Sequence, residues 1–166
     1  MSETTKIRMF QITAHGLLLF VLCVLQGMVF PALQLWGTVP LLFPLAVVAV
    51  GLFEGPTWGG VFGLLAGFLS DLFFAESLVL FMITLTLLGM GLGLLSVHLL
   101  NRRFLSYILC AGASLLLLAF LQAFPFLVYQ RVAPWILLGV ALRQTLLTIL
   151  FAPLLYLIIQ AMPREE

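Results

Sequence analysis

The sequence predicts an all-α polytopic membrane protein, a compact bundle of about six transmembrane helices that forms a single domain over residues 1–166. Composition is the first reason: 64% of the residues are hydrophobic and only 8% are charged, whereas a soluble domain carries roughly 25% charged residues. Apolar runs of bilayer-spanning length cover nearly the whole chain. Finally, every connection is short, and none approaches the roughly 40 residues that a small soluble domain needs.

Six apolar runs define the expected spans. A spanning helix needs roughly 20 residues, and four of the runs meet that length easily. The second and third runs are short, and we interpret them as a tight helical pair. Alternatively, the second run is re-entrant and the chain has five spans. The expected spans are residues 9–30, 39–53, 57–74, 78–100, 104–129 and 134–161.

The distribution of basic residues predicts the orientation of these spans. The first run is too long for the apolar part of a signal peptide, so we interpret it as a retained span. With six spans and a cytoplasmic N-terminus, both termini are cytoplasmic and only Arg131 falls outside. Cytoplasmic segments are enriched in lysine and arginine, which favours this orientation. The basic residues on the cytoplasmic side are then Lys6, Arg8, Arg102, Arg103 and Arg164.

Small residues recur at helical spacing in two of the runs. Gly59, Gly63 and Gly67 stand four residues apart, and Gly89 and Gly93 repeat the spacing in the fourth run. Glycine costs about 1 kcal/mol relative to alanine in a helix in water. Within lipid, small residues let helix backbones approach closely, and this packing offsets the cost. The glycines therefore predict a close-packed seam, either between the third and fourth spans or against a partner protein.

Three ionisable residues in or beside the spans call for an explanation. Glu54 and Gly55 precede Pro56, which suits the first turn of a helix. The Glu54 carboxylate then either complements the positive helix end or contacts a partner at the cytoplasmic face. Asp71 and Arg143 lie within spans, where charges are usually paired or functional. Both fall in the outer half of the bundle, so we expect a buried ion pair, the alternative being that Arg143 reaches lipid or a partner protein.

The segment PLLFPLAVVAVGLFEGPTWGGVFGLLAGFLSDLFF, residues 40–74, resembles the rod shape-determining protein MreD family. That family is of similar length and has a proline-led apolar run, followed by a glycine-spaced helix that ends in aspartate. The charged turn NRRF before the fifth span is also similar to the family. The matching positions are Pro40, Pro44, Glu54, Gly55, Pro56, Gly59, Gly63, Gly67 and Asp71.

The resemblance implies a non-enzymatic component of the machinery that elongates bacterial cells and builds the lateral peptidoglycan wall. The location it implies is the bacterial inner membrane, with the protein surrounded by the lipid bilayer. The implied partners are an MreC-like protein, a RodA-type glycosyltransferase with its penicillin-binding protein and, indirectly, the actin-like MreB. It implies no catalytic residue, cofactor or metal, and the net charge of +1 argues against nucleic acid as a partner.

Two other functions are compatible with a small helical membrane protein. One is the substrate-capturing membrane subunit of an energy-coupling-factor vitamin transporter, but that function needs a polar, aromatic-lined outer pocket, and the outer loops here are short. The other is a membrane enzyme, which needs an activated nucleophile or a metal cluster. His15 and His98 have no acid at metal-ligand spacing, and Cys23 and Cys110 form no C-x-x-C motif.

Overall fold

The computed structural model describes residues 3–33, 38–73, 80–98, 104–129 and 134–161. These residues are helical apart from short connecting stretches, and they contain no strand, which confirms the predicted all-α bundle. The helices are α1 (Glu3–Val24), the π-helical turn η1 (Leu25–Val29), α2 (Phe30–Leu33), α3 (Leu42–Glu54), α4 (Pro56–Phe73), α5 (Leu80–His98), α6 (Phe104–Tyr129), α7 (Pro134–Leu150) and α8 (Ala152–Gln160).

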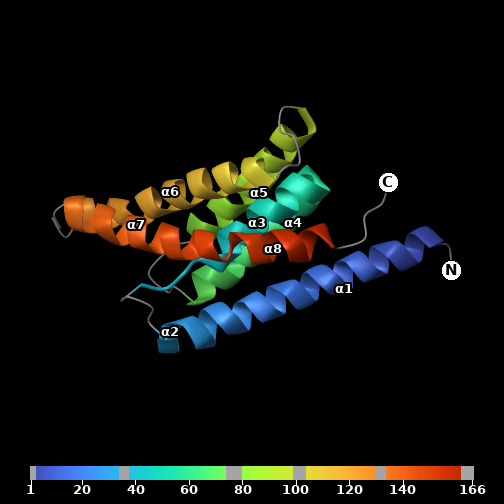
Figure 1. Cartoon of the computed structure of the whole chain (residues 1–166), viewed down its shortest axis with the longest axis horizontal. Helices are drawn as coiled ribbons and strands as arrows, with labels where there is room; N and C mark the ends of the chain where they lie inside the picture. Colours follow the sequence, from blue (N-terminus) through green and yellow to red (C-terminus); the bar gives the residue numbers. More distant parts are fainter. Residues whose placement is uncertain (1–2, 34–37, 74–79, 99–103, 130–133, 162–166) are drawn as a thin grey trace.

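The helices run back and forth along the long axis of the molecule (Figure 1). The start of α1 and the end of α8 lie at the same end of that axis (Figure 1). Three stretches are long and apolar enough to cross a bilayer, namely Met9–Ala32, Phe104–Ala123 and Trp135–Gln160. Many large apolar side chains on α1, α4, α5, α6, α7 and α8 are exposed. An apolar exterior of this extent indicates a membrane protein.

Helix α3 is the centre of the bundle. Every residue from Leu42 to Phe53 is buried, because α4, α5, α6 and α8 all pack against this helix. Helix α1 lies along one side of the bundle (Figure 1), where it packs against α4. Helix α3 has 13 residues, which span about 20 Å, a length shorter than the hydrocarbon core of roughly 30 Å. Helix α3 alone is therefore too short to cross a bilayer, and an extended stretch precedes it.

The approach to α3 is an extended stretch, residues 38–41, whose backbone polar groups are bound by side chains. The Gln26 side-chain oxygen accepts hydrogen bonds from the N–H groups of Leu42 and Phe43, at 3.1 and 3.2 Å. The N–H of Leu41 donates to the Thr148 hydroxyl at 3.0 Å. Non-helical backbone at membrane depth is tolerated only when the protein itself satisfies it. These side chains therefore allow α3 to begin inside the bundle.

Irregular helix turns place both of these capping side chains. Gln26 lies in η1, where the N–H of Phe30 bonds back to Leu25, and this widened turn comes immediately before Pro31. Thr148 lies beside the break between α7 and α8, where the N–H of Phe151 bonds to the Thr148 carbonyl at 3.0 Å. Pro153 follows this break, and a proline cannot supply the N–H that a continuous helix would use there. A proline therefore lies close to each irregular turn, Pro31 after η1 and Pro153 after the break between α7 and α8, and both turns carry a side chain that binds the start of α3.

Candidate functional site

The predicted glycine seam lies inside the molecule, between α4 and α5. A Cβ added to Gly63 would stand 2.9 Å from the carbonyl carbon of Leu85. At Gly67 the added carbon would stand 2.8 Å from the carbonyl oxygen of Phe81. Real Cβ atoms essentially never come within 3.0 Å of another heavy atom. Only glycine at these positions lets the two backbones touch, so this face of α4 is covered by the chain's own helix.

The seam continues through α5 to the turn between α3 and α4. A Cβ on Gly59 would stand 2.7 Å from the Cα of Gly51, and one on Gly51 would stand 2.6 Å from the Gly89 oxygen. A Cβ on Gly93 would lie 2.5 Å from the Pro56 nitrogen. Glycines from three helices thus meet at one crossing, which extends the seam beyond the two spans in which the spacing was visible.

Glycine also makes the turn between α3 and α4 possible. Gly55 has a φ of 92°, a backbone conformation that residues with a Cβ rarely adopt. Its N–H bonds to the Gly51 oxygen at 3.1 Å, and its own carbonyl accepts the first bond of α4 from Gly59 at 3.0 Å. Pro56 begins α4 at once, where its missing N–H costs nothing. A single residue therefore reverses the chain.

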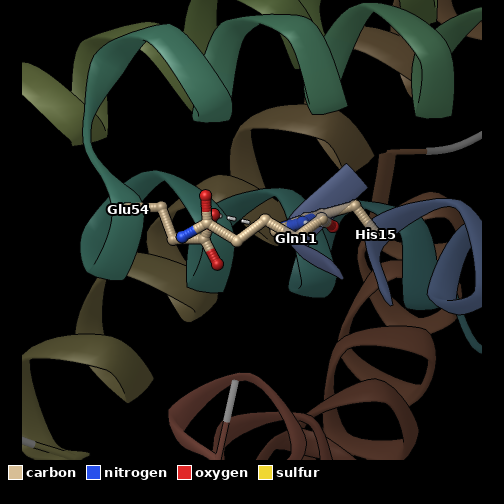
Figure 2. A network of polar contacts seen from close by, with 3 residues as sticks. All are labelled: Gln11, His15 and Glu54. Carbon is tan, nitrogen blue, oxygen red and sulfur yellow. Dashed lines mark hydrogen bonds and ion pairs between the residues drawn. The ribbon is translucent and has the colours of Figure 1, made fainter. Parts of the chain in front are cut away.

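Glu54 pairs with a histidine of α1. His15 Nε2 lies 3.0 Å from Glu54 Oε2, and the two side chains are only 6% and 2% exposed. Figure 2 shows both side chains, together with Gln11, where α1 passes the end of α3. The imidazole stacks on Trp58, with ring centroids 5.3 Å apart, and meets Phe62 edge-on at 5.7 Å. This cluster joins α1 to the α3–α4 turn.

The distances around His15 constrain where hydrogens lie on the His15–Glu54 pair. His15 Nδ1 lies 2.7 Å from the backbone oxygen of Gln11, which can only accept, so Nδ1 carries a hydrogen. A proton must then lie on Nε2 or on the Glu54 carboxyl, because two bare lone pairs 3.0 Å apart would repel. Either arrangement leaves the pair with no net charge. The contact between His15 and Glu54 is a close polar contact that falls short of hydrogen-bond geometry, and neither Glu54 oxygen accepts a hydrogen bond from the start of α4. Glu54 therefore does not cap α4.

Asp71 binds the start of α5. Its two carboxylate oxygens accept hydrogen bonds from the N–H groups of Phe81 and Met82, at 3.2 and 3.0 Å. A helix begins with N–H groups that have no partner within the helix and carries a partial positive charge there. The Asp71 carboxylate accepts hydrogen bonds from these N–H groups, and its negative charge is attracted to the partial positive charge. Asp71 therefore caps a neighbouring helix, at the end of the glycine seam that leads to it.

The structure corrects the expected pairing of Asp71 with Arg143. The Arg143 side chain is exposed on α7, and no ion pair joins these two described residues. Helix α7 packs against α6, α8 and α3, whereas α4 packs against α3, α5 and α1. The positions of the two residues along their spans predict the same half of the bilayer but do not indicate which helices are neighbours. The backbone of α5 supplies the positive partner that Asp71 was expected to find in arginine.

The polar residues that connect α3 to the outer helices were not predicted. Gln26 is 1% exposed and Thr148 is fully buried, and Gln144 donates to the backbone oxygen of Val39 at 3.0 Å. Polar side chains inside apolar runs were the available signal, since lipid-facing positions rarely carry them. Within the described ranges no group of three or more histidine, cysteine or acidic residues could hold a metal ion, and both cysteines are free.

Comparison of the chain with protein-family models, with curated proteins and with solved structures gave no match. The fold and the polar contacts themselves therefore define its class. The described residues form an all-α bundle with three helical stretches long and apolar enough to cross a membrane, built around a buried central helix and a glycine seam.

Proposed function

We propose that this protein is a non-enzymatic component of the bacterial cell-elongation machinery and acts by binding partner membrane proteins through its helices. The implied partners are an MreC-like protein and, in the same assembly, a RodA-type glycosyltransferase with its penicillin-binding protein. Contact with MreB is indirect. The protein lies in the inner membrane, crosses it several times and has both termini in the cytoplasm.

The observation that supports the proposal most is the organisation of the segment that carries the resemblance. Its residues from Pro40 to Phe73 form the buried helix α3, the one-residue turn at Gly55 and the glycine face of α4. These are the parts around which the other helices pack. The residues that carry the resemblance thus form the interior of the bundle, and the outward faces of α1, α6 and α7 remain for other proteins.

The direct test is depletion of the protein in the bacterium that encodes it. We expect rod-shaped cells to become wide and round, and incorporation of a fluorescent D-amino acid along the lateral wall to fall. Expression of the native chain in trans should restore both. Unchanged cell width and unchanged lateral labelling, after immunoblots show that the protein has gone, would contradict the proposal.

The vitamin-transporter alternative makes a different prediction. A substrate-capturing subunit is stabilised by its vitamin, because a ligand that binds only the folded state raises the unfolding temperature. Thermal unfolding of the purified protein in detergent, with and without a panel of water-soluble vitamins, separates the two functions. For an elongation component we expect no vitamin to shift the transition.

A further inference from the structure

A groove of about 220 Å³ opens between α6 and α7. Two glutamines, Gln122 and Gln144, line it together with alanines from both helices. Alanines leave room for another helix to approach closely, as small residues do at helix contacts in membranes. The groove is distinct from the glycine seam, which α5 already fills. It is also remote from the buried His15–Glu54 pair, which joins α1 to the α3–α4 turn.

The amide groups that line the groove do not all form hydrogen bonds with the described residues. The Gln122 amide makes no side-chain hydrogen bond to them. Gln144 donates from Nε2 to Val39, but its side-chain oxygen accepts no hydrogen bond from the described part of the chain. An amide that faces hydrocarbon without a partner is costly, and helices in membranes use such amides to bind one another. The groove therefore offers donors and acceptors to an incoming helix.

A positive charge lies on α7, on the residue next to one that lines the groove. Arg143 immediately precedes Gln144, and its side chain is exposed on α7. It lies nine residues after Pro134, the start of α7, and so about 14 Å along the helix. Gln122 lies seven residues before the end of α6 at Tyr129, about 10 Å along that helix. The arginine and the amide are therefore at similar depths, well inside the apolar part of the bundle.

We propose that this groove binds a transmembrane helix of a partner membrane protein, and that this helix carries a carboxylate at the depth of Arg143. The inference rests on the proposed function and adds to it the surface and the chemistry of the partner. Arginine remains charged at any accessible pH and needs a negative partner inside a membrane. A carboxylate binds its planar fork through two parallel hydrogen bonds. The helix backbone and small side chains then fill the groove next to the two glutamines.

Other occupants fit these observations less well. A lipid phosphate lies at the surface, farther from Arg143 than the roughly 7 Å that an arginine side chain can extend. A second copy of this chain would bring a second Arg143 to a symmetric contact. Its acids within the spans, Glu54 and Asp71, are already engaged with His15 and with α5. A partner helix with its own acid satisfies both the groove and the charge.

The test uses the full chain reconstituted in phosphatidylcholine vesicles, with a synthetic transmembrane peptide as the probe. The peptide is a 22-residue leucine–alanine helix, about 33 Å long, with one glutamate about nine residues from one end and a fluorophore. The matched control peptide has glutamine in place of glutamate. Energy transfer from a label on the protein reports binding. We expect the glutamate peptide to bind about 5- to 30-fold more tightly, the ratio that one inter-helix polar contact gives.

Two kinds of variant assign this preference to the groove. Arg143→Leu should abolish the difference between the two peptides, and Arg143→Lys should keep most of it. Ala141→Phe should weaken both peptides by filling the groove, whereas Leu146→Phe, on the exposed face of α7, should change neither. Circular dichroism and size-exclusion profiles confirm that each variant is folded. Because the probe is synthetic, the result is independent of any effect on cell shape.

The proposal is overturned if the native protein binds both peptides equally, or if Arg143→Leu keeps the preference for glutamate. Unchanged peptide binding in Ala141→Phe would place the contact elsewhere and would also overturn it. Energy transfer between labelled copies of the protein that disappears in Ala141→Phe, with no preference between the peptides, would assign the groove to self-association instead.

Discussion

Gly63 of α4 lies against Leu85 of α5 so closely that no side chain fits between the two backbones. A Cβ on Gly63 would stand 2.9 Å from the Leu85 carbonyl carbon. The atoms it would meet are backbone, which cannot turn away as the end of a long side chain could. The close approach of α4 and α5 therefore depends directly on the absence of one methyl group.

Substitution at Gly63 should destabilise the protein, and more severely as the side chain grows. Gly63→Ala should cost about 1–3 kcal/mol, the usual penalty of overpacking, and Gly63→Leu should lower abundance strongly. The matched control is Gly91→Ala in α5, where an added Cβ meets nothing within 4 Å. That control should be neutral or stabilising by up to about 1 kcal/mol. Thermal unfolding in detergent measures all three, and equal stability of Gly63→Ala and Gly91→Ala would contradict the seam.

The His15–Glu54 pair should hold α1 to the bundle. His15→Phe leaves the Glu54 carboxylate buried without its partner, which should cost about 3–5 kcal/mol. The double variant His15→Phe, Glu54→Leu removes both polar side chains and should recover part of that loss. Gly16→Ala, at an open position of α1, serves as the control. Unfolding free energies in detergent give the coupling, and a double variant that loses the full sum of both single losses would rule out the pairing.

The side chains that cap the start of α3 should be needed for stability. Thr148→Val removes the acceptor for the N–H of Leu41 and should cost about 1–3 kcal/mol, because the donor stays buried. Gln26→Leu removes the acceptor for two N–H groups and should cost more. Thr145→Val is the matched control, since Thr145 is buried on the same helix and makes no side-chain hydrogen bond to the described residues. Equal effects of the two threonine substitutions would show that the cap contributes nothing.

The seam and the buried polar contacts differ in how far the sequence could predict them. Residues spaced four apart lie on one face of any α-helix, so the positions of Gly59, Gly63 and Gly67 were enough to predict the close-packed face. The pairing of His15 with Glu54 joins residues far apart in the chain, and no spacing rule brings α1 to the α3–α4 turn. The sequence likewise shows Gln26 as a polar residue in an apolar run, but not the widened helical turn that directs it to α3.

Asp71 illustrates why a correct principle led to a wrong partner. An acid within a span needs a positive counterpart, and Arg143 is the only lysine or arginine inside a predicted span. The start of α5 supplies the same electrostatic property through backbone N–H groups. Such helix ends are invisible when only charged side chains are counted. Predicting the partner required the neighbour relationships between helices, which depth alone does not give.

Asp71 and Arg143 should therefore act independently. Asp71→Ala should cost about 1–2 kcal/mol by removing the cap on α5, and Asp71→Asn should cost less because one acceptor remains. Arg143→Gln should leave stability nearly unchanged, since its side chain is exposed. In the double variant the losses should add to within about 0.5 kcal/mol. Rescue of either loss by the second substitution, measured by thermal unfolding, would restore the ion-pair interpretation.

Co-purification shows whether this helical bundle binds membrane partners of the elongation machinery. The tagged native chain is extracted from membranes in mild detergent, and the recovered proteins are quantified by mass spectrometry. Gly91→Ala is purified in parallel at matched abundance. The account predicts that the native chain and Gly91→Ala recover an MreC-like protein far above an untagged control. Recovery of no elongation protein above that control would contradict it.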